Sequence, residues 1–186
     1  MKSLATRMIR LSLMVLAFSW LVPARAALDV GDTVVKFSAP AALAGKPFTC
    51  SLAGALANGP VVVFFFPAAF STDCSIKAHA FAEAIEQFAA LGATVIGVST
   101  DDIETLTKFS SQPCQGRFPV ASDSTRSVSK SFDALMQTRP DSANRISYVI
   151  APNGSVASYH QSLNPSKHVE KMLAAVKDIP QTRDKK

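Results

Sequence analysis

The sequence feature that most limits the fold is a run of six apolar residues, Val61–Phe66 (VVVFFF), which ends at Pro67. Every residue of the run is β-branched or aromatic, and such residues favour strands. A half-buried strand would alternate apolar and polar residues, so a run without a polar position predicts a strand buried on both faces. Such a strand needs other elements on both faces of its sheet, which predicts an α/β fold.

The segments that follow this strand predict a crossover. Apolar residues recur every three or four positions between Ile76 and Leu91, which predicts an amphipathic helix from about Cys74 to near Gly92. The segment Thr94–Ser99 (TVIGVS) is a second apolar strand. A strand, a helix and a strand in this order form a right-handed parallel crossover.

The remainder of the chain adds shorter elements. We expect helices from Asp102 to about Ser110, from Thr125 to about Met136 and from Pro165 to Asp178. The turn Pro152-Asn153-Gly154 lies between two apolar segments, 146–151 and 155–159, which predicts an antiparallel hairpin. Together these elements predict one domain with a mixed β-sheet flanked by helices on both sides, and the hydrophobic content of 48% can supply its core.

The first 26 residues have the pattern of a secretory signal peptide. Three basic residues precede an apolar run from Leu11 to Val22, and the small residues Ala24 and Ala26 follow it. A membrane anchor is the alternative, but a run of twelve apolar residues is shorter than the roughly 20 that span a bilayer. We therefore expect residues 1–26 to be removed, residues 27–186 to form the domain, and the protein to be periplasmic or secreted without stable membrane association.

The charge of the chain indicates no nucleic-acid partner. The formal net charge is +5, but residues 1–26 contain four basic and no acidic side chains, which leaves 15 basic and 14 acidic residues in 27–186. No basic stripe is present. The three cysteines, Cys50, Cys74 and Cys114, follow the predicted signal peptide, and at most one intramolecular pair can form among them.

Cys74 lies where the buried strand gives way to a helix, which is the usual place for a binding crevice in an open α/β sheet. Free backbone N–H groups and the helix dipole stabilise an anion in the first helical turn, so a thiol there ionises more readily. The alternative is a packed core cysteine. The neighbours favour reactivity: Pro67 cannot donate a backbone hydrogen bond and can press against the sulfur, and Ser71 offers a hydroxyl one turn earlier.

The segment PAAFSTDC (residues 67–74) resembles the active-site signature P-x-x-x-[TS]-x-x-C of the peroxiredoxins. The resemblance covers most of residues 28–178 and is nearest to the bacterioferritin comigratory protein or peroxiredoxin Q branch. It implies a thioredoxin-like fold and a peroxidase that needs no cofactor or metal. It also implies an arginine from the start of a later strand beside the thiolate, and Arg145 in NRISYVIAPNG fits that place.

The resemblance further implies the chemistry of the site. The Cys74 thiolate attacks the terminal oxygen of a hydroperoxide and becomes a sulfenic acid, while Arg145, Ser71 and backbone N–H groups stabilise the charge of the leaving oxygen. The alternatives are a thioredoxin-like thiol–disulfide oxidoreductase of the periplasm and a non-catalytic binding module. The first needs C-x-x-C, and Ser71 stands where its first cysteine would be; the second leaves the motif unexplained.

One part of the family pattern is missing. Many members of this branch carry a second, resolving cysteine five residues after the first, where this chain has His79. Cys114 in SSQPCQGRF is then the resolving candidate, which would require the first turn of the predicted helix to unwind. A structural Cys50–Cys114 bridge, or no intramolecular resolver, are the alternatives. The implied partners are a hydroperoxide and a thiol reductant of the cell envelope. The branch resemblance favours a monomer. We expect the walls of the peroxide pocket to include Phe70 and Phe118.

Overall fold

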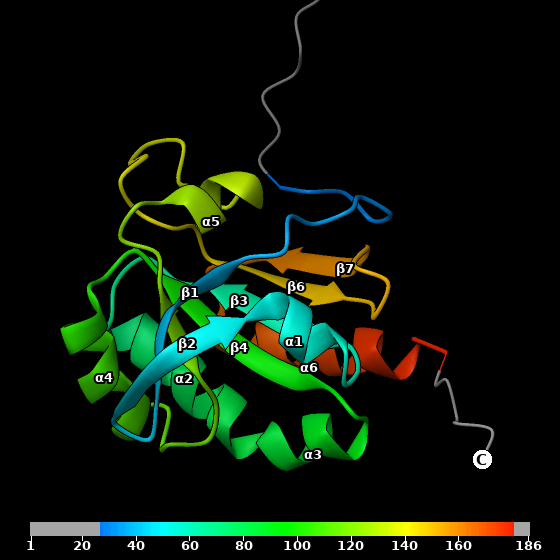
Figure 1. Cartoon of the computed structure of the whole chain (residues 1–186), viewed down its shortest axis with the longest axis horizontal. Coiled ribbons are helices and arrows are strands. Elements are labelled where there is room, and N and C mark those ends of the chain that lie inside the picture. The colour runs from blue at the N-terminus through cyan, green and yellow to red at the C-terminus, as the bar shows by residue number, and fades with distance from the viewer. Residues whose placement is uncertain (1–26, 181–186) are drawn as a thin grey trace, which may run out of the picture.

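The computed structural model describes residues 27–180, so the predicted signal peptide, residues 1–26, lies outside the described residues. The described chain forms seven strands and six helices (Figure 1). In chain order these are β1 (Ser38–Leu43), β2 (Lys46–Ser51), α1 (Leu52–Leu56), β3 (Val61–Phe65), α2 (Thr72–Glu83), α3 (Ile85–Ala90), β4 (Thr94–Ser99), α4 (Ile103–Ser111), β5 (Val120–Ser122), α5 (Ser127–Ser131), β6 (Ile146–Ile150), β7 (Val156–Gln161) and α6 (Pro165–Lys177).

All seven strands belong to one mixed sheet in the order β2-β1-β5-β4-β3-β6-β7. The strand predicted from the apolar run, β3, lies inside this sheet, parallel to β4 on one side and antiparallel to β6 on the other. The hairpin predicted around Pro152-Asn153-Gly154 is formed by β6 and β7, which pair antiparallel. The prediction of a mixed α/β sheet is therefore confirmed.

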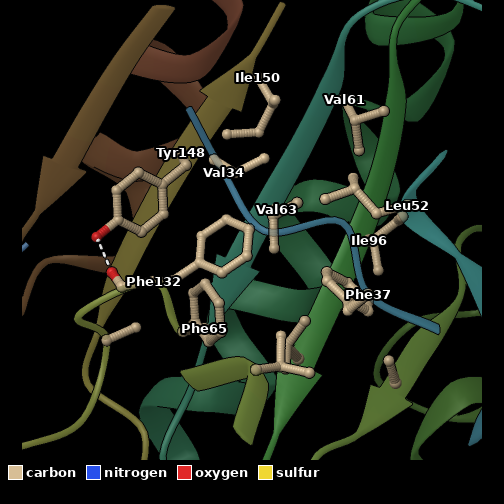
Figure 2. Packing of buried hydrophobic residues seen from close by; sticks show 14 of the residues in the cluster. Val34, Phe37, Leu52, Val61, Val63, Phe65, Ile96, Phe132, Tyr148 and Ile150 are labelled. Carbon is tan, nitrogen blue, oxygen red and sulfur yellow. Dashed lines mark hydrogen bonds between the residues drawn. The ribbon is translucent and has the colours of Figure 1, made fainter. Parts of the chain in front are cut away.

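Alternate residues of β3 supply two separate hydrophobic cores, one on each face of the sheet. Val61, Val63 and Phe65 belong to one core, which α1, α5 and the segment 27–37 cover. Phe65 packs there with Phe132 and Tyr148, whose hydroxyl donates to the Phe132 carbonyl at 2.7 Å (Figure 2). Every side chain of β3 is fully buried, which explains why the run has no polar position.

The second core lies between the sheet and the helices α2, α3, α4 and α6 (Figure 1). Val62, Phe64 and Phe66 face it, and the ring of Phe64 stacks on Phe81 of α2 with 4.5 Å between the ring centroids. Phe81 in turn lies 5.9 Å from the ring of Phe88 in α3. These contacts fix α2 directly against the central strand.

Two of the predicted helices differ from the structure. The helix predicted from Cys74 to Gly92 begins at Thr72 and is interrupted at Ala84, where α2 ends and α3 starts. No glycine or proline marks this break in the sequence. The helix predicted over 125–136 is only α5 (Ser127–Ser131), because the chain turns at Asp133 with a left-handed φ of 48°. Within residues 27–180, no helix has the length and apolar character needed to cross a bilayer.

Candidate active site

The loop between β3 and α2 carries the first part of the predicted motif. Pro67 follows the strand by one residue beyond Phe66, and Ser71 is the N-cap residue of α2. The Ser71 hydroxyl donates to the Ala68 carbonyl at 3.0 Å, so it braces the loop rather than capping the helix. Phe70 has a left-handed φ of 61°, which marks the sharpest bend of this loop.

Asp101 fastens the same loop to the end of β4, and the sequence pattern did not indicate this residue. Its carboxylate accepts from the Ala69 backbone N–H at 2.6 Å and from the Ser99 hydroxyl at 2.7 Å. Ala69 lies in the loop after β3, Ser99 is the last residue of β4, and these two strands are parallel neighbours. The loop is therefore held at the edge of the sheet where α/β proteins bind ligands.

Cys74 is the third residue of α2 and only 2% exposed. The backbone N–H groups of the first helical turn have no partner within the helix, so they present positive charge at this end of α2. Ser71 is the N-cap residue of α2 and Cys74 lies three positions later, so the two residues share one helical turn. The thiol belongs to the second core, at the point where this core meets the loop.

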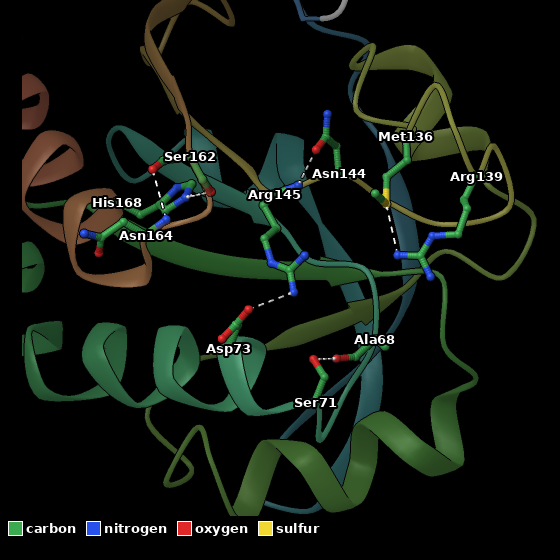
Figure 3. A network of polar contacts seen from close by, with 10 residues as sticks. All are labelled: Ala68, Ser71, Asp73, Met136, Arg139, Asn144, Arg145, Ser162, Asn164 and His168. Atoms are coloured by element: carbon green, nitrogen blue, oxygen red, sulfur yellow. Dashed lines mark hydrogen bonds and ion pairs between the residues drawn. The ribbon is translucent and has the colours of Figure 1, made fainter.

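Arg145 comes from a distant part of the sequence and contacts the first turn of α2, the turn that carries Cys74. It directly precedes β6, and the antiparallel pairing of Ser147 with Phe64 places the start of β6 beside the end of β3. Its guanidinium nitrogen Nη2 lies 3.3 Å from the Asp73 carboxylate, immediately before Cys74 (Figure 3). The guanidinium is thus oriented toward the N-terminus of α2, and only 20% of the Arg145 side chain is exposed.

A pocket of about 420 Å³ opens beside Arg145 and is lined by Asn144, Arg145, Gln161, Ser162 and Leu163. These lining residues lie just before β6, at the last position of β7 and in the two residues that follow β7. Phe118, which we expected in a pocket wall, is instead buried in the second core, where its ring packs against Phe64. Phe70 is half exposed and packs edge-on against Phe109 of α4.

Lys77 is a second cation near Cys74 that sequence reasoning missed. It lies one helical turn after the thiol and is 2% exposed. Its ammonium nitrogen donates to the Phe65 carbonyl at 3.3 Å and lies 5.3 Å from the centroid of the Phe64 ring. Burial lowers the pKa of Lys77 to about 7, while the charge of Cys74 acts in the opposite direction and that of Arg145 adds to the lowering.

Two histidines, His160 and His168, interact electrostatically with Lys77. The ring of His168 on α6 is bonded on both nitrogens, to the Ser147 hydroxyl at 2.9 Å and to the Ser162 carbonyl at 3.0 Å. A carbonyl can only accept, so Nε2 carries the proton and Nδ1 accepts from the serine. Burial first, and then the charge of Lys77, lower the pKa of His168 to about 3, and the same two causes are among those that lower the pKa of His160.

The other two cysteines lie on opposite faces of the sheet. Cys114, in the turn after α4, is fully buried in the second core together with Cys74, and burial raises the pKa of its thiol. Cys50 on β2 belongs to the first core, and burial raises the pKa of its thiol as well. All three are free thiols in this structure.

His79, which replaces the expected cysteine of the branch, points away from the core. Its ring contacts the Gln115 amide at 2.8 Å and the Glu83 carboxylate at 3.3 Å. Gln115 directly follows Cys114, so this contact ties the Cys114 turn to α2. No group of three side chains within residues 27–180 is arranged to hold a metal ion.

A helix with a cysteine in its first turn at the edge of a mixed α/β sheet, and an arginine placed beside that turn from the start of a later strand, define a thiol-based site on a thioredoxin-like fold. Comparison with known proteins agrees with this geometry. Residues 30–159 match the AhpC/TSA family model, and the chain belongs to this family. It is a thiol-dependent peroxidase of the peroxiredoxin class.

Individual relatives support this assignment. The chain is 31% identical over 157 residues to a Mycobacterium tuberculosis protein that carries a peroxiredoxin name, covering 82% of this chain and 98% of that protein. It is also 31% identical over 121 residues to chloroplastic peroxiredoxin Q of Sedum lineare, which covers 64% of each chain. The crystal structure of peroxidoxin BcpB from M. tuberculosis superposes with a TM-score of 0.74 at 28% identity, covering 82% of this chain and 98% of that one.

Proposed function

We propose that Cys74 is the residue that reduces the hydroperoxide, with Pro67, Ser71 and Arg145 as the other members of its active site. The Cys74 thiolate attacks the terminal oxygen of the hydroperoxide, an S–O bond forms and the O–O bond breaks. Cys74 becomes a sulfenic acid, and the departing oxygen leaves as an alcohol or water once it has gained a proton.

The single observation that carries this proposal is the placement of Arg145. Its guanidinium contacts Asp73 next to Cys74, although 72 positions separate the two residues in the chain. A guanidinium is always charged and donates in a planar fork, so it suits a thiolate and a peroxide oxygen together. With the free N–H groups of α2, it stabilises the charge that develops on the leaving oxygen more than it stabilises the bound peroxide.

The test is the reaction of the reduced protein with hydrogen peroxide in a stopped-flow instrument. Cys74→Ser is expected to abolish peroxide consumption and to leave the circular dichroism spectrum unchanged. Cys50→Ser is the matched control, because Cys50 lies in the core on the opposite face of the sheet, and it should keep the wild-type rate. Peroxide turnover that persists in Cys74→Ser would disprove the proposal.

We assign the resolving role to Cys114 on the basis of three features. Cys74 and Cys114 belong to the same hydrophobic core, whereas Cys50 belongs to the other. Ser71 makes no side-chain capping bond to α2, so the first turn lacks about 1 kcal/mol that a cap would supply. Gln115 and Gly116 both have left-handed φ angles, which shows a tight turn beside Cys114. Local unwinding of α2 and rearrangement of this turn would join the two sulfurs.

Peptide mapping after one equivalent of hydrogen peroxide checks this assignment. A peptide pair joined through Cys74 and Cys114 is expected in the wild type, and Cys114→Ser should accumulate the Cys74 sulfenic acid, detected by dimedone. A disulfide that joins two protein molecules, or a sulfenic acid that persists in the wild type, would remove Cys114 from the cycle.

The remaining proposals concern the cellular setting. The basic and apolar pattern of residues 1–26 supports export with removal of that segment, leaving 27–186 as the functional domain in the periplasm or outside the cell. The reductant would then be a thiol protein of the cell envelope. We favour a monomer. Fractionation with N-terminal sequencing, and light scattering of the purified domain, test these points; an N-terminus at Met1 or a stable dimer would contradict them.

A further inference from the structure

Lys77 is a buried cation, and no carboxylate within residues 27–180 accompanies it. Among residues 27–180, the carboxylates that form ion pairs do so with His79, Arg117, Arg145 and Lys167, and none pairs with Lys77. Its neighbours are a carbonyl oxygen and an aromatic ring, those of Phe65 and Phe64. A buried ammonium is costly unless an opposite charge accompanies it, so the position of Lys77 needs an explanation.

The charged and titratable groups around Lys77 come from four elements. Cys74 lies on its own helix, one turn earlier, and residues three apart share a helix face. Arg145 precedes β6, His160 is on β7 and His168 is on α6, and all three interact electrostatically with Lys77. The nearest carboxylate of the site, Asp73, is paired with Arg145.

Cys74 is the one group in this set that carries a negative charge when it is ionised and is not already paired with a cation. His168 is hydrogen-bonded through both ring nitrogens, whereas Nε2 of His160 is buried and has no hydrogen-bond partner within residues 27–180, and both rings repel the ammonium when they are protonated. Of these groups, only Cys74 favours the charged form of Lys77, and the interaction is mutual because a coupling between two sites is reciprocal.

We propose that Lys77 is the electrostatic partner of the Cys74 thiolate, and that Lys77 loses its proton when Cys74 is oxidised. Lys77 is a positioning residue that acts through Cys74. This inference rests on the proposed function only for the oxidation step; the pairing itself concerns the reduced protein alone.

The atoms and charges of the oxidation step balance with no net uptake of a proton from the medium. The reduced pair is an ammonium and a thiolate, and it reacts with a hydroperoxide to give a neutral amine, a sulfenic acid and an alcohol. The S–O bond forms as the O–O bond breaks, two electrons pass from sulfur to the peroxide, and the alcohol oxygen gains the proton that Lys77 releases through solvent. The uncharged sulfenic acid no longer stabilises an ammonium in this buried position.

Alkylation of Cys74 by iodoacetamide across a pH series tests the pairing without peroxide. Lys77→Met has a similar length and no charge, and we expect it to move the midpoint of the pH profile upward by about one unit, which slows alkylation about tenfold below the midpoint. Lys108→Met removes a charge from an exposed lysine on α4 and is expected to leave the profile unchanged. Peptide mass spectrometry distinguishes Cys74 from the two other cysteines.

An unchanged midpoint in a folded Lys77→Met protein would overturn the pairing. A second measurement keeps the inference testable if that variant does not fold. In wild-type protein with ¹³C-labelled lysine, the pH titration of the Lys77 Cε resonance, assigned by its loss in Lys77→Arg, should have its midpoint at a lower pH after one equivalent of peroxide than in the reduced state. A Lys77 titration that oxidation leaves unchanged would contradict the proposal.

The two possible failures can be told apart. If peroxide does not oxidise Cys74 in the wild type, the proposed function fails, whereas the alkylation profile still reports on the pair. If Cys74 is oxidised normally and its alkylation profile does not depend on Lys77, only the inference about Lys77 fails.

Discussion

At the scale of single residues, two cations with different environments lie around one sulfur. Arg145 is partly exposed, borders the pocket and is paired with Asp73. Lys77 is buried and donates to the carbonyl of Phe65, the last residue of β3. An exposed and permanently charged group suits contact with the incoming peroxide, whereas a buried amine can change its charge as the sulfur changes its own.

Replacement of Arg145 by alanine should lower the rate of peroxide reduction by about 10²-fold or more, because in our proposal this side chain donates to the leaving oxygen. Arg145→Lys should recover only part of the rate, since an ammonium lacks the planar fork. Stopped-flow kinetics measure both. Arg117→Ala is the matched control, because Arg117 pairs with Glu86 away from the site; a similar loss there would indicate a general effect of charge.

The sequence identifies some of these residues and not others, for physical reasons. Pro67, Ser71 and Cys74 are close in the chain, so their spacing alone places them on one loop and one helical turn. Arg145 was found only through the family resemblance, because no local pattern reports which strands are neighbours. Lys77 carried a signal that was missed, a charged residue at the helix position that faces the core beside Cys74 and Ala78. Asp101 carried none, since its two partners are set by tertiary structure.

At the scale of secondary structure elements, the position of Cys74 depends on how α2 packs on β3. Phe81 on α2 is fully buried and stacks nearly parallel to Phe64, with an interplanar angle of 5°. Lys77 lies one turn before Phe81 and contacts the same Phe64 ring. The ring of Phe64 therefore sets the distance between the helix and the strand.

Phe81→Ala should lower the free energy of unfolding by about 3–5 kcal/mol, because it leaves a cavity between α2 and β3. Phe48→Ala on the edge strand β2 is the control, since Phe48 is 43% exposed and its loss should change stability by about 0.5 kcal/mol or less. Urea unfolding measures both values. Equal losses in the two variants would mean that the stacked rings do not determine the packing of α2.

The elements were predicted well where one local pattern dominates. β3 was expected from an unbroken apolar run, and α6 (Pro165–Lys177) from apolar residues that share one helix face. The break at Ala84 escaped prediction, because an alanine continues a helix as readily as it ends one. The short α5 escaped prediction too: the Asp123 carboxylate accepts from Val128 and Ser129 and holds its start, and the chain then turns at Asp133.

At the scale of the whole molecule, His168 joins α6 to the end of the sheet. It accepts from Ser147 on β6 and donates to the Ser162 carbonyl after β7, and it is almost fully buried. Protonation would place a second positive charge near Lys77 and would break the bond from the Ser147 hydroxyl. The folded protein therefore holds this ring neutral.

This arrangement predicts a dependence of stability on acidity. The pKa of His168 falls from its ordinary 6.5 to about 3 in the folded protein, so between these values the unfolded chain binds the additional proton. The free energy of unfolding should fall as the pH decreases from about 6.5 to about 3, by about 1.4 kcal/mol per pH unit from this group. Above pH 6.5 the contribution of the group is complete.

Urea unfolding of the wild type and of His168→Gln at several pH values measures this contribution. The variant should be less stable at pH 7, because it loses packing and a hydrogen bond. Its free energy of unfolding should decline less steeply as the pH falls, because its unfolding takes up one proton fewer than that of the wild type. Parallel curves for the two proteins would show that another group causes the acid sensitivity.

The antiparallel neighbours β3 and β6 have a consequence for biosynthesis. A ribosome completes the segment with Cys74 well before it reaches Arg145, and the two meet only when β6 has been inserted beside β3. In our proposal, a nascent chain therefore carries Cys74 before it carries the guanidinium that completes the site. The fast reaction with peroxide that we propose would then begin only when the sheet closes, and Cys74 in an unfinished polypeptide would react as slowly as an ordinary cysteine.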